Sequence, residues 1–199
     1  MGKLIYGIRC LWYFCAGHVY ALFHYDKKYL RGRWFTGKMK GVFSVGWKWV
    51  YFDAKGLRIN FRNSTARYPV SCQNIVSNPQ NIEFDPEDLN NFQGFGKYFQ
   101  AVGKITIGKG TYIGPNVGLI TTNHDVNNPD VHLEAKPVVL GRKCWIGMNS
   151  VIMPGVVLGD NTVVGAGSIV TKSFEQGNVV IAGNPAKVIK ELDNKGNEE

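Results

Sequence analysis

The clearest pattern in this chain is an aliphatic residue that recurs every six positions through the C-terminal half. The pattern occupies two blocks, at Ile107, Ile113, Leu119, Leu140, Ile146, Ile152, Leu158, Val164 and Val170. Glycine often follows the aliphatic residue, and a small or β-branched residue usually stands four positions after it. A hexapeptide period of this kind is the sequence signature of a parallel β-helix.

The period also predicts the shape of each coil. In each hexad the large aliphatic residue and the small residue point inward, and a corner pair between them supplies a turn. The corner pairs are Lys109-Gly110, Pro115-Asn116, Pro154-Gly155, Asp160-Asn161 and Ala166-Gly167. Three hexads close one triangular coil, so residues 107–124 form one coil and 140–175 form two more. An ordinary β-sandwich would need this spacing to arise by chance in every unit.

The repeat is interrupted once, and the interruption predicts a site. Residues 125–139 form a non-repeat excursion, and His124 is the last residue of the hexad before it. A long loop that leaves a rigid scaffold usually carries function. Histidine is the natural general base near neutral pH, and Asp125 or Glu134 could orient its ring. The alternative for His124 is a solvated loop histidine. His132, within the excursion, is interpreted as structural or solvent-facing.

The N-terminal third has a different character. Leu4 to Tyr25 is almost wholly apolar and aromatic, and basic residues follow at Lys27, Lys28, Arg31 and Arg33. Arg9 inside the apolar run argues against a membrane span. The pattern is typical of an interfacial membrane anchor, or of a helix packed on its own domain or on another subunit. Both alternatives stay open at this point.

An alternation of apolar residues follows between residues 41 and 61. It predicts two strands around a turn at Asp53-Ala54-Lys55-Gly56, which would form the first coil or a cap of the β-helix. The expected organisation is an apolar and basic arm over 1–40, a β-helix domain over 41–190 and a polar tail over 191–199. The fold class is therefore all-β, with an N-terminal apolar helix and a C-terminal tail.

Charge and cysteine content narrow the function classes. The net charge is +8, but residues 1–70 hold 13 Lys or Arg and 2 acidic residues, which gives +11, and the remainder sums to −3. No nucleic-acid motif accompanies this basicity, so a negative membrane surface or a phosphate-bearing substrate suits it better. The four cysteines show no metal or disulfide spacing, which is typical of reduced thiols in the cytoplasm. Cys144 occupies an inward hexad position, where packing is the expected role.

The repeat resembles the left-handed β-helix hexapeptide-repeat acyltransferases, and within them the maltose, galactoside and capsular-polysaccharide O-acetyltransferases. The resemblance spans roughly residues 94–190. It rests on four segments, which are Asn123-His124-Asp125, Cys144-Trp145-Ile146-Gly147, Gly165 to Lys172 and Ala182 to Lys187. The N-terminal third lacks the helical cap typical of the maltose acetyltransferases.

The resemblance implies a mechanism and a set of roles. His124 takes the proton of an acceptor hydroxyl, which attacks the thioester of acetyl-CoA directly, and backbone amides near Trp145 and Gly147 hold the oxyanion. Gln100 and Asn123 are expected near the acceptor. The residues expected along the coenzyme are Trp145, Gly147, Ala166, Thr171, Lys172, Lys187 and Lys190. The alternative role for Gln100 is packing. The alternative for Lys187 and Lys190 is that they belong to a solvated tail.

The resemblance therefore implies an acetyl-CoA-dependent O-acetyltransferase of a sugar in capsule, lipopolysaccharide or other surface-glycan biosynthesis. Family members form trimers whose sites lie between subunits, and they need no metal. We expect a cytoplasmic location or one on the inner face of the cell membrane, and no nucleic-acid partner. The alternatives are N-acetylation of an amino sugar and a non-catalytic scaffold. A γ-type carbonic anhydrase would need three metal-binding histidines, and the repeat holds His124 and His132 alone.

Overall fold

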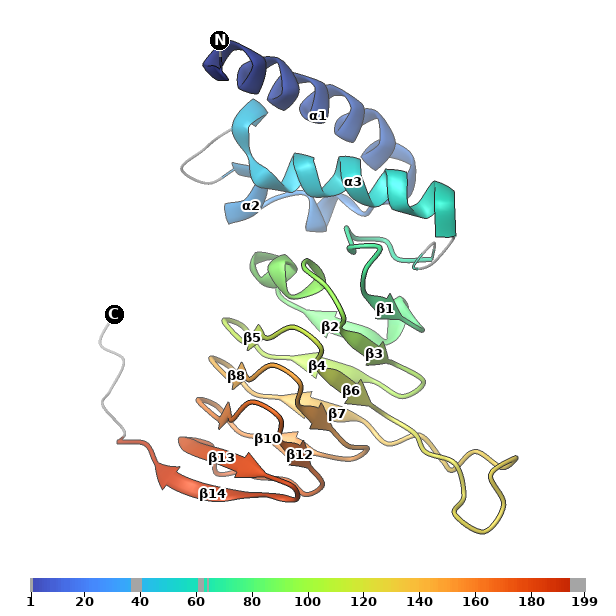
Figure 1. Cartoon of the computed structure of the whole chain (residues 1–199), viewed down its shortest axis with the longest axis vertical. Coiled ribbons are helices and arrows are strands. Elements are labelled where there is room, and N and C mark those ends of the chain that lie inside the picture. The colour runs from blue at the N-terminus through green and yellow to red at the C-terminus, as the bar shows by residue number, and fades with distance from the viewer. Residues whose placement is uncertain (1, 37–40, 61–62, 64, 194–199) are drawn as a thin grey trace.

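The computed structural model describes residues 2–36, 41–60, 63 and 65–193. A prism of stacked coils makes up the larger part, and a helical unit covers its N-terminal end (Figure 1). None of the helices in the described ranges is long and apolar enough to cross a membrane.

The prism has three sheets, and all pairs between coils are parallel. The first sheet has the order β1-β3-β6-β9-β12, the second β10-β7-β4-β2 and the third β14-β13-β11-β8-β5. The strand bounds are β1 Ile75–Val76, β2 Ile82–Phe84, β3 Tyr98–Gln100, β4 Ile105–Ile107, β5 Tyr112–Ile113, β6 Gly118–Ile120, β7 Val138–Leu140, β8 Trp145–Ile146, β9 Val151–Ile152, β10 Val157–Leu158, β11 Val163–Val164, β12 Ile169–Val170, β13 Val179–Gly183 and β14 Ala186–Glu191. The register stacks the hexads directly, because Leu119 faces Ile152 and Ile152 faces Val170.

The predicted inward positions form the core. Each of the nine aliphatic positions is at most 7% exposed, and the small residues at the matching positions are at most 1% exposed. Cys144 is one of the latter, and burial raises the pKa of its thiol, as expected for a packed, unreactive cysteine. The β-helix prediction is confirmed, and coils also precede the regular hexads predicted from Ile107, because the first strand begins at Ile75.

The corners also follow the prediction. The second residue of each predicted pair has a positive φ, at Gly110, Asn116, Gly155, Asn161 and Gly167. Glycine and asparagine are the residues that adopt this region at least cost. Asparagines at the same corner of successive coils then hydrogen-bond to each other, Asn116 to Asn149 at 3.1 Å and Asn161 to Asn178 at 2.9 Å.

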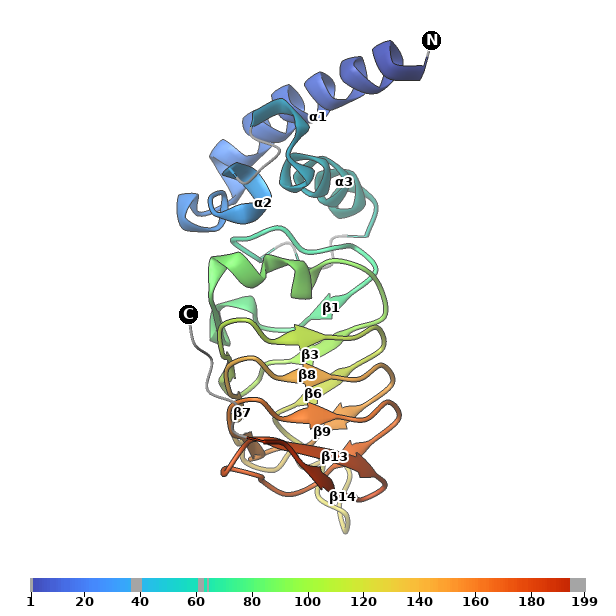
Figure 2. The same ribbon diagram turned by 90° about the vertical axis from the view of Figure 1, so that its left-hand side faces the viewer.

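The helical unit comprises α1 and α3 with shorter turns between them. Its elements are α1 Gly2–His24, η1 Lys27–Tyr29, α2 Arg33–Thr36, η2 Gly41–Phe43 and α3 Val45–Asn60. Two further 3-10 helices, η3 Pro79–Asn81 and η4 Pro86–Phe92, belong to the first coils. In Figures 1 and 2, α3 lies between α1 and the prism, so α1 is the outermost layer.

The strands predicted between residues 41 and 61 are wrong, because this segment is the helix α3. The buried positions described in this helix are Gly46, Trp47, Val50, Asp53 and Gly56, which recur mostly at intervals of three or four residues and therefore lie on one side of the helix. The alternation of aromatic residues was misleading because several of them are exposed or half-buried. Residues 61 and 62 lie outside the described ranges. A cap does cover the first coil, as predicted, but helices form it, contrary to the expectation that the N-terminal third lacks a helical cap.

Specific contacts fix the helical unit to the prism. Tyr29 of η1 stacks on Phe84 of β2, with ring centroids 5.0 Å apart. The Trp34 indole donates a hydrogen bond to the Glu87 carbonyl at 2.7 Å, and the Arg33 guanidinium lies 3.5 Å from the Asp88 carboxylate. These contacts hold the cap in a defined position over the coils.

Candidate active site

His124 lies where the chain leaves the prism. The segment after β6 extends outward and returns to β7 at Val138, so the excursion ends two residues earlier than predicted (Figure 1). Its base is an antiparallel pair, in which the Asp125 amide donates to the Val131 carbonyl and the Leu133 amide to the Asn123 carbonyl, both at 2.8 Å. The pairing gives His124 a fixed place beside the coils.

The His124 ring is oriented by a backbone carbonyl. Its Nδ1 atom lies 2.5 Å from the Pro129 carbonyl oxygen, and the ring packs on His132 with centroids 4.1 Å apart. A carbonyl oxygen only accepts hydrogen bonds, so Nδ1 carries a proton, and in the neutral ring the lone pair is on Nε2. This is the tautomer that a general base requires. Sequence reasoning missed Pro129, because backbone carbonyls leave no signal in composition.

The two carboxylates expected to orient the ring have other surroundings. Asp125 Oδ1 accepts hydrogen bonds from the Asn127 and Asn128 amides, at 2.7 and 3.1 Å, and so shapes the turn of the excursion. Glu134 is exposed on the returning segment. Their predicted role as orienting groups is therefore taken by Pro129.

Gln100 braces the segment that leads to the histidine. Its Oε1 atom accepts hydrogen bonds from the Thr121 and Thr122 amides, each at 3.1 Å. The packing alternative thus holds for this oxygen, while contact of the side-chain NH₂ with an acceptor stays a prediction. Asn123 is exposed next to His124, and its contact with an acceptor stays a prediction.

The predicted site residues divide between two edges of the prism. We call the segments after β6, β9 and β12 the histidine edge, and those after β5, β8 and β11 the alanine edge. The histidine edge holds Asn123, His124, Thr171 and Lys172, and the alanine edge holds Gly147 and Ala166. Trp145, on β8 just before the alanine edge, is 60% exposed on the outer surface. The strands of the first sheet separate the two edges within one copy of the chain.

The predicted oxyanion hole at Trp145 and Gly147 is wrong. The Trp145 amide donates to the Thr162 carbonyl at 3.0 Å, and the Gly147 amide to the Val164 carbonyl at 2.8 Å. Both donors are therefore used in the ladder between coils and cannot stabilise an oxyanion. Glycine at 147 has a packing reason instead, because a Cβ atom there would lie 2.6 Å from the Ala166 amide nitrogen.

The three predicted phosphate-binding lysines are exposed at the C-terminal end of the prism. The Lys172 ammonium lies 5.6 Å from the centroid of the Phe174 ring. Lys187 and Lys190 on β14 face Ala182 and Val180, two alternate residues of β13, across a register shift. Directly opposed side chains share a face of a sheet, so the shift keeps both lysines on one face.

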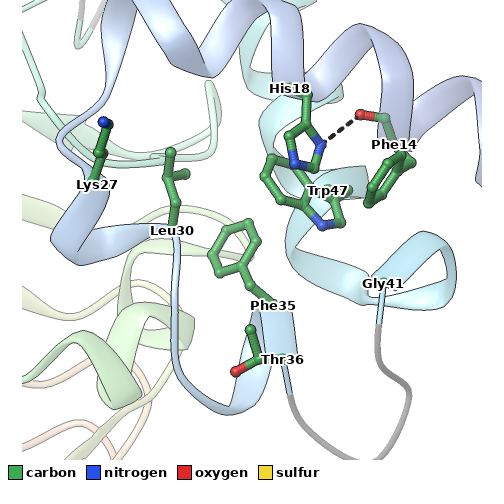
Figure 3. Close-up of a pocket in the computed structure, with 8 residues that line it drawn as sticks. All are labelled: Phe14, His18, Lys27, Leu30, Phe35, Thr36, Gly41 and Trp47. Atoms are coloured by element: carbon green, nitrogen blue, oxygen red, sulfur yellow. Dashed lines mark hydrogen bonds between the residues drawn. The ribbon is translucent and has the colours of Figure 1, made fainter.

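A large cavity lies elsewhere, in the helical unit. It has a volume of about 750 Å³, and Figure 3 shows Phe14, His18, Phe35 and Trp47 on its wall. The His18 ring stacks on Trp47 at 3.6 Å between centroids and is bonded at Nδ1 to the Phe14 carbonyl. We regard His18 as a packing residue and assign this cavity no part in the chemistry at His124.

Comparison with known proteins agrees with the repeat fold. Residues 137–172 match the family described as bacterial transferase hexapeptide (six repeats). The chain is 45% identical over 94 residues to the galactoside O-acetyltransferase of Escherichia coli K12, which covers 46% of each protein. It is 46% identical over 90 residues to a candidate colanic acid biosynthesis acetyltransferase of the same organism, covering 45% of this chain and 49% of the relative.

A solved structure of a galactoside acetyltransferase in complex with coenzyme A superimposes with a TM-score of 0.54 and 36% identity, over 61% of this chain and 60% of that one. The chain spans about half the length of the curated relatives it matches. Its repeat region is similar to hexapeptide-repeat acyltransferases, which confirms the resemblance seen in the sequence.

Proposed function

We propose that this chain is an acetyl-CoA-dependent O-acetyltransferase that acts on a sugar hydroxyl in the synthesis of a capsule, lipopolysaccharide or other surface glycan. The observation that carries the proposal is His124, held at the break in the coil with its Nδ1 bonded to Pro129. The relatives named for galactoside and colanic acid acetylation support the acceptor class. The left-handed turn of the coils is part of the same proposal.

The residues of this chain carry out a direct transfer. His124 Nε2 takes the proton of the acceptor hydroxyl, and the hydroxyl oxygen bonds to the thioester carbonyl carbon. The carbon–sulfur bond breaks, and the proton held by His124 passes to the departing thiolate. Gln100 acts by holding the backbone before His124, and Asp125 by holding the turn after it. No acyl-enzyme is formed.

The coenzyme would use groups at both edges of the prism. The exposed Ala166 allows close approach of the pantetheine arm near Trp145 and Gly147, and Lys172, Lys187 and Lys190 offer charge to the phosphates. Because the two edges are apart in one copy, we propose a homotrimer in which the histidine edge of one copy meets the alanine edge of the next. Glu134 and Asn123 would then face the acceptor.

We place the protein in the cytoplasm, with residues 1–40 at the inner face of the cell membrane. We propose that residues 41–190 form the acyltransferase domain, with α3 as part of its cap. Residues 191–199 form the tail. A lipid-linked acceptor would meet the site at such a surface.

The test is consumption of acetyl-CoA against a panel of sugars, amino sugars and glycolipid precursors. Acetyl ester formation on a sugar, detected by mass spectrometry, is the expected result. Formation of an amide on an amino sugar would move the reaction to N-acetylation. Acetyl-CoA that stays intact with every member of the panel would favour the scaffold.

A further inference from the structure

A stripe of large apolar side chains runs the whole length of α1 and faces solvent. Its members recur at intervals of one, three, four and seven residues and are 52–73% exposed, at Leu4, Ile8, Leu11, Trp12, Val19, Leu22 and Phe23. These intervals place them on one face of the helix. The buried residues of α1 are Cys10, Gly17 and Ala21, so the stripe is not the face that packs on α3.

The stripe lies at the free end of the molecule. Figures 1 and 2 both show α1 as the layer farthest from the coils, with α3 between α1 and the coils. Within the described residues no other element covers it. A contiguous apolar surface of this length, exposed on a folded protein, marks a site of interaction.

The charge around the stripe selects its partner. Residues 1–70 carry +11, and their two acidic residues are Asp26 and Asp53. Asp26 pairs with Arg67 at 3.3 Å and Asp53 is buried, so neither leaves an unpaired negative charge on this surface. An anionic bilayer complements this charge. A second copy of the chain would oppose like charges across the same face.

A second cavity, of about 510 Å³, lies on the flank of the stripe. Tyr6, Arg9 and Tyr13 of α1 line one side, and Phe43 and Lys48 line the other. Arg9 and Trp12 are three residues apart, so the cation sits beside the stripe. Among the described residues neither Arg9 nor Lys48 has an ion pair, whereas a third cation in the lining, Arg33, already meets Glu87 and Asp88.

We infer that the outer face of α1 lies in the interfacial layer of an anionic phospholipid bilayer, with Arg9 and Lys48 against the lipid phosphates. This inference specifies the residues of the membrane contact in the proposed function. It rests on the proposed membrane location but not on the proposed acetyl transfer. Apolar side chains that enter the acyl boundary and cations that remain among the headgroups are the two forces that hold such a helix in the membrane plane.

The first test uses full-length protein and sedimentation with vesicles. Wild-type protein should pellet with vesicles containing phosphatidylglycerol and remain in solution with pure phosphatidylcholine, and added salt should release it. Leu11→Gln with Val19→Gln should abolish pelleting, since glutamine keeps helix propensity but removes the apolar surface. Val102→Gln, an exposed apolar position on the prism, is the matched control and should pellet normally.

The second test removes charge. Arg9→Gln with Lys48→Gln should weaken binding to anionic vesicles by about 30-fold, the factor given by ~1 kcal/mol for each of two charges. Lys104→Gln with Lys143→Asn removes the same charge from the prism, and asparagine suits the positive φ of position 143. This control should bind nearly as wild type, and equal weakening by both pairs would overturn the role of Arg9 and Lys48.

Trp12 reports directly on insertion. Brominated phospholipids should quench its fluorescence, and Trp12→Phe should still pellet but lose most of that quenching. Wild-type protein that stays in the supernatant at low salt overturns the inference. The inference also fails if the variant Leu11→Gln with Val19→Gln still pellets with anionic vesicles and differs from wild type only in its oligomeric state. Acetyl transfer to a soluble sugar, measured on the same folded variants, tests the enzyme separately and should be unchanged.

Discussion

His124 is the residue on which the proposed chemistry depends. Replacing it with alanine should lower turnover by about 10²–10⁴-fold, the usual effect of losing a general base, while coenzyme binding survives. Steady-state rates and calorimetric titration with CoA would measure both. His24→Gln, an exposed histidine on α1, is the matched control. Near-wild-type turnover of His124→Ala on a genuine acceptor would show that another group takes the proton.

Asp53 is a buried carboxyl whose Oδ2 atom has no hydrogen-bond partner among the described residues. Burial raises its pKa from 3.8 to about 8, and a hydrogen bond with Gln93 offsets part of this. Between pH 4 and 8 the unfolded chain releases this proton while the folded chain keeps it. Stability should therefore fall as pH rises through this window and level off above it.

Asp53→Asn tests this directly. The variant keeps the shape without a group that ionises in the buried site, so it should be more stable than wild type at pH 8.5 by about 1–3 kcal/mol. The gain should shrink toward pH 4.5. Urea unfolding at both values measures it, and a gain that is equal at both would assign the effect to packing.

At the scale of elements, glycines set the spacing between coils. A Cβ atom at position 108 would lie 2.4 Å from the Gly141 carbonyl carbon, a backbone atom that cannot rotate away. Gly108→Ala should therefore destabilise the fold by roughly 1–3 kcal/mol, as overpacking does. Gly167→Asn is the control, because space there is open and asparagine accepts its φ of 72°. Thermal unfolding should separate the two variants clearly.

The hairpin of β13 and β14 carries the proposed phosphate contacts. Exposed charges are screened by salt, so CoA affinity should fall with ionic strength, and dephospho-CoA should be less sensitive. Lys187→Gln with Lys190→Gln should reduce the salt dependence, whereas Lys109→Gln, on another edge, should leave it intact. Equal salt dependence for CoA and dephospho-CoA would argue that charge does not hold the 3′-phosphate.

The accuracy of the sequence analysis varied with the element. The hexads were predictable because one inward aliphatic residue and one small residue recur in every coil, so each unit supports the others. Residues 45–60 were not, because an aromatic alternation coincided with a helix whose buried face is set by packing on α1. At the site, His124 was found through its place in the repeat. The Pro129 carbonyl that orients His124, and the carbonyls that occupy the amides of Trp145 and Gly147, could not be found in this way, because backbone partners depend on the fold.

At the scale of the whole molecule, the separation of the two edges makes a prediction about assembly. If each site joins the histidine edge of one copy to the alanine edge of the next, two inactive variants should complement each other. His124→Ala removes the base, and Ala166→Trp fills the exposed path of the coenzyme arm without altering the base. Each variant alone should be inactive, and light scattering should show a trimer for both.

Co-expressed in equal amounts, the two variants should regain activity. A site is intact when the copy that supplies its histidine edge carries Ala166→Trp and the copy that supplies its alanine edge carries His124→Ala. Random mixing gives about a quarter of the sites this composition in a closed ring. Activity should approach that fraction of wild type. Mixed trimers that remain inactive would place the histidine and the coenzyme path of each site on the same copy.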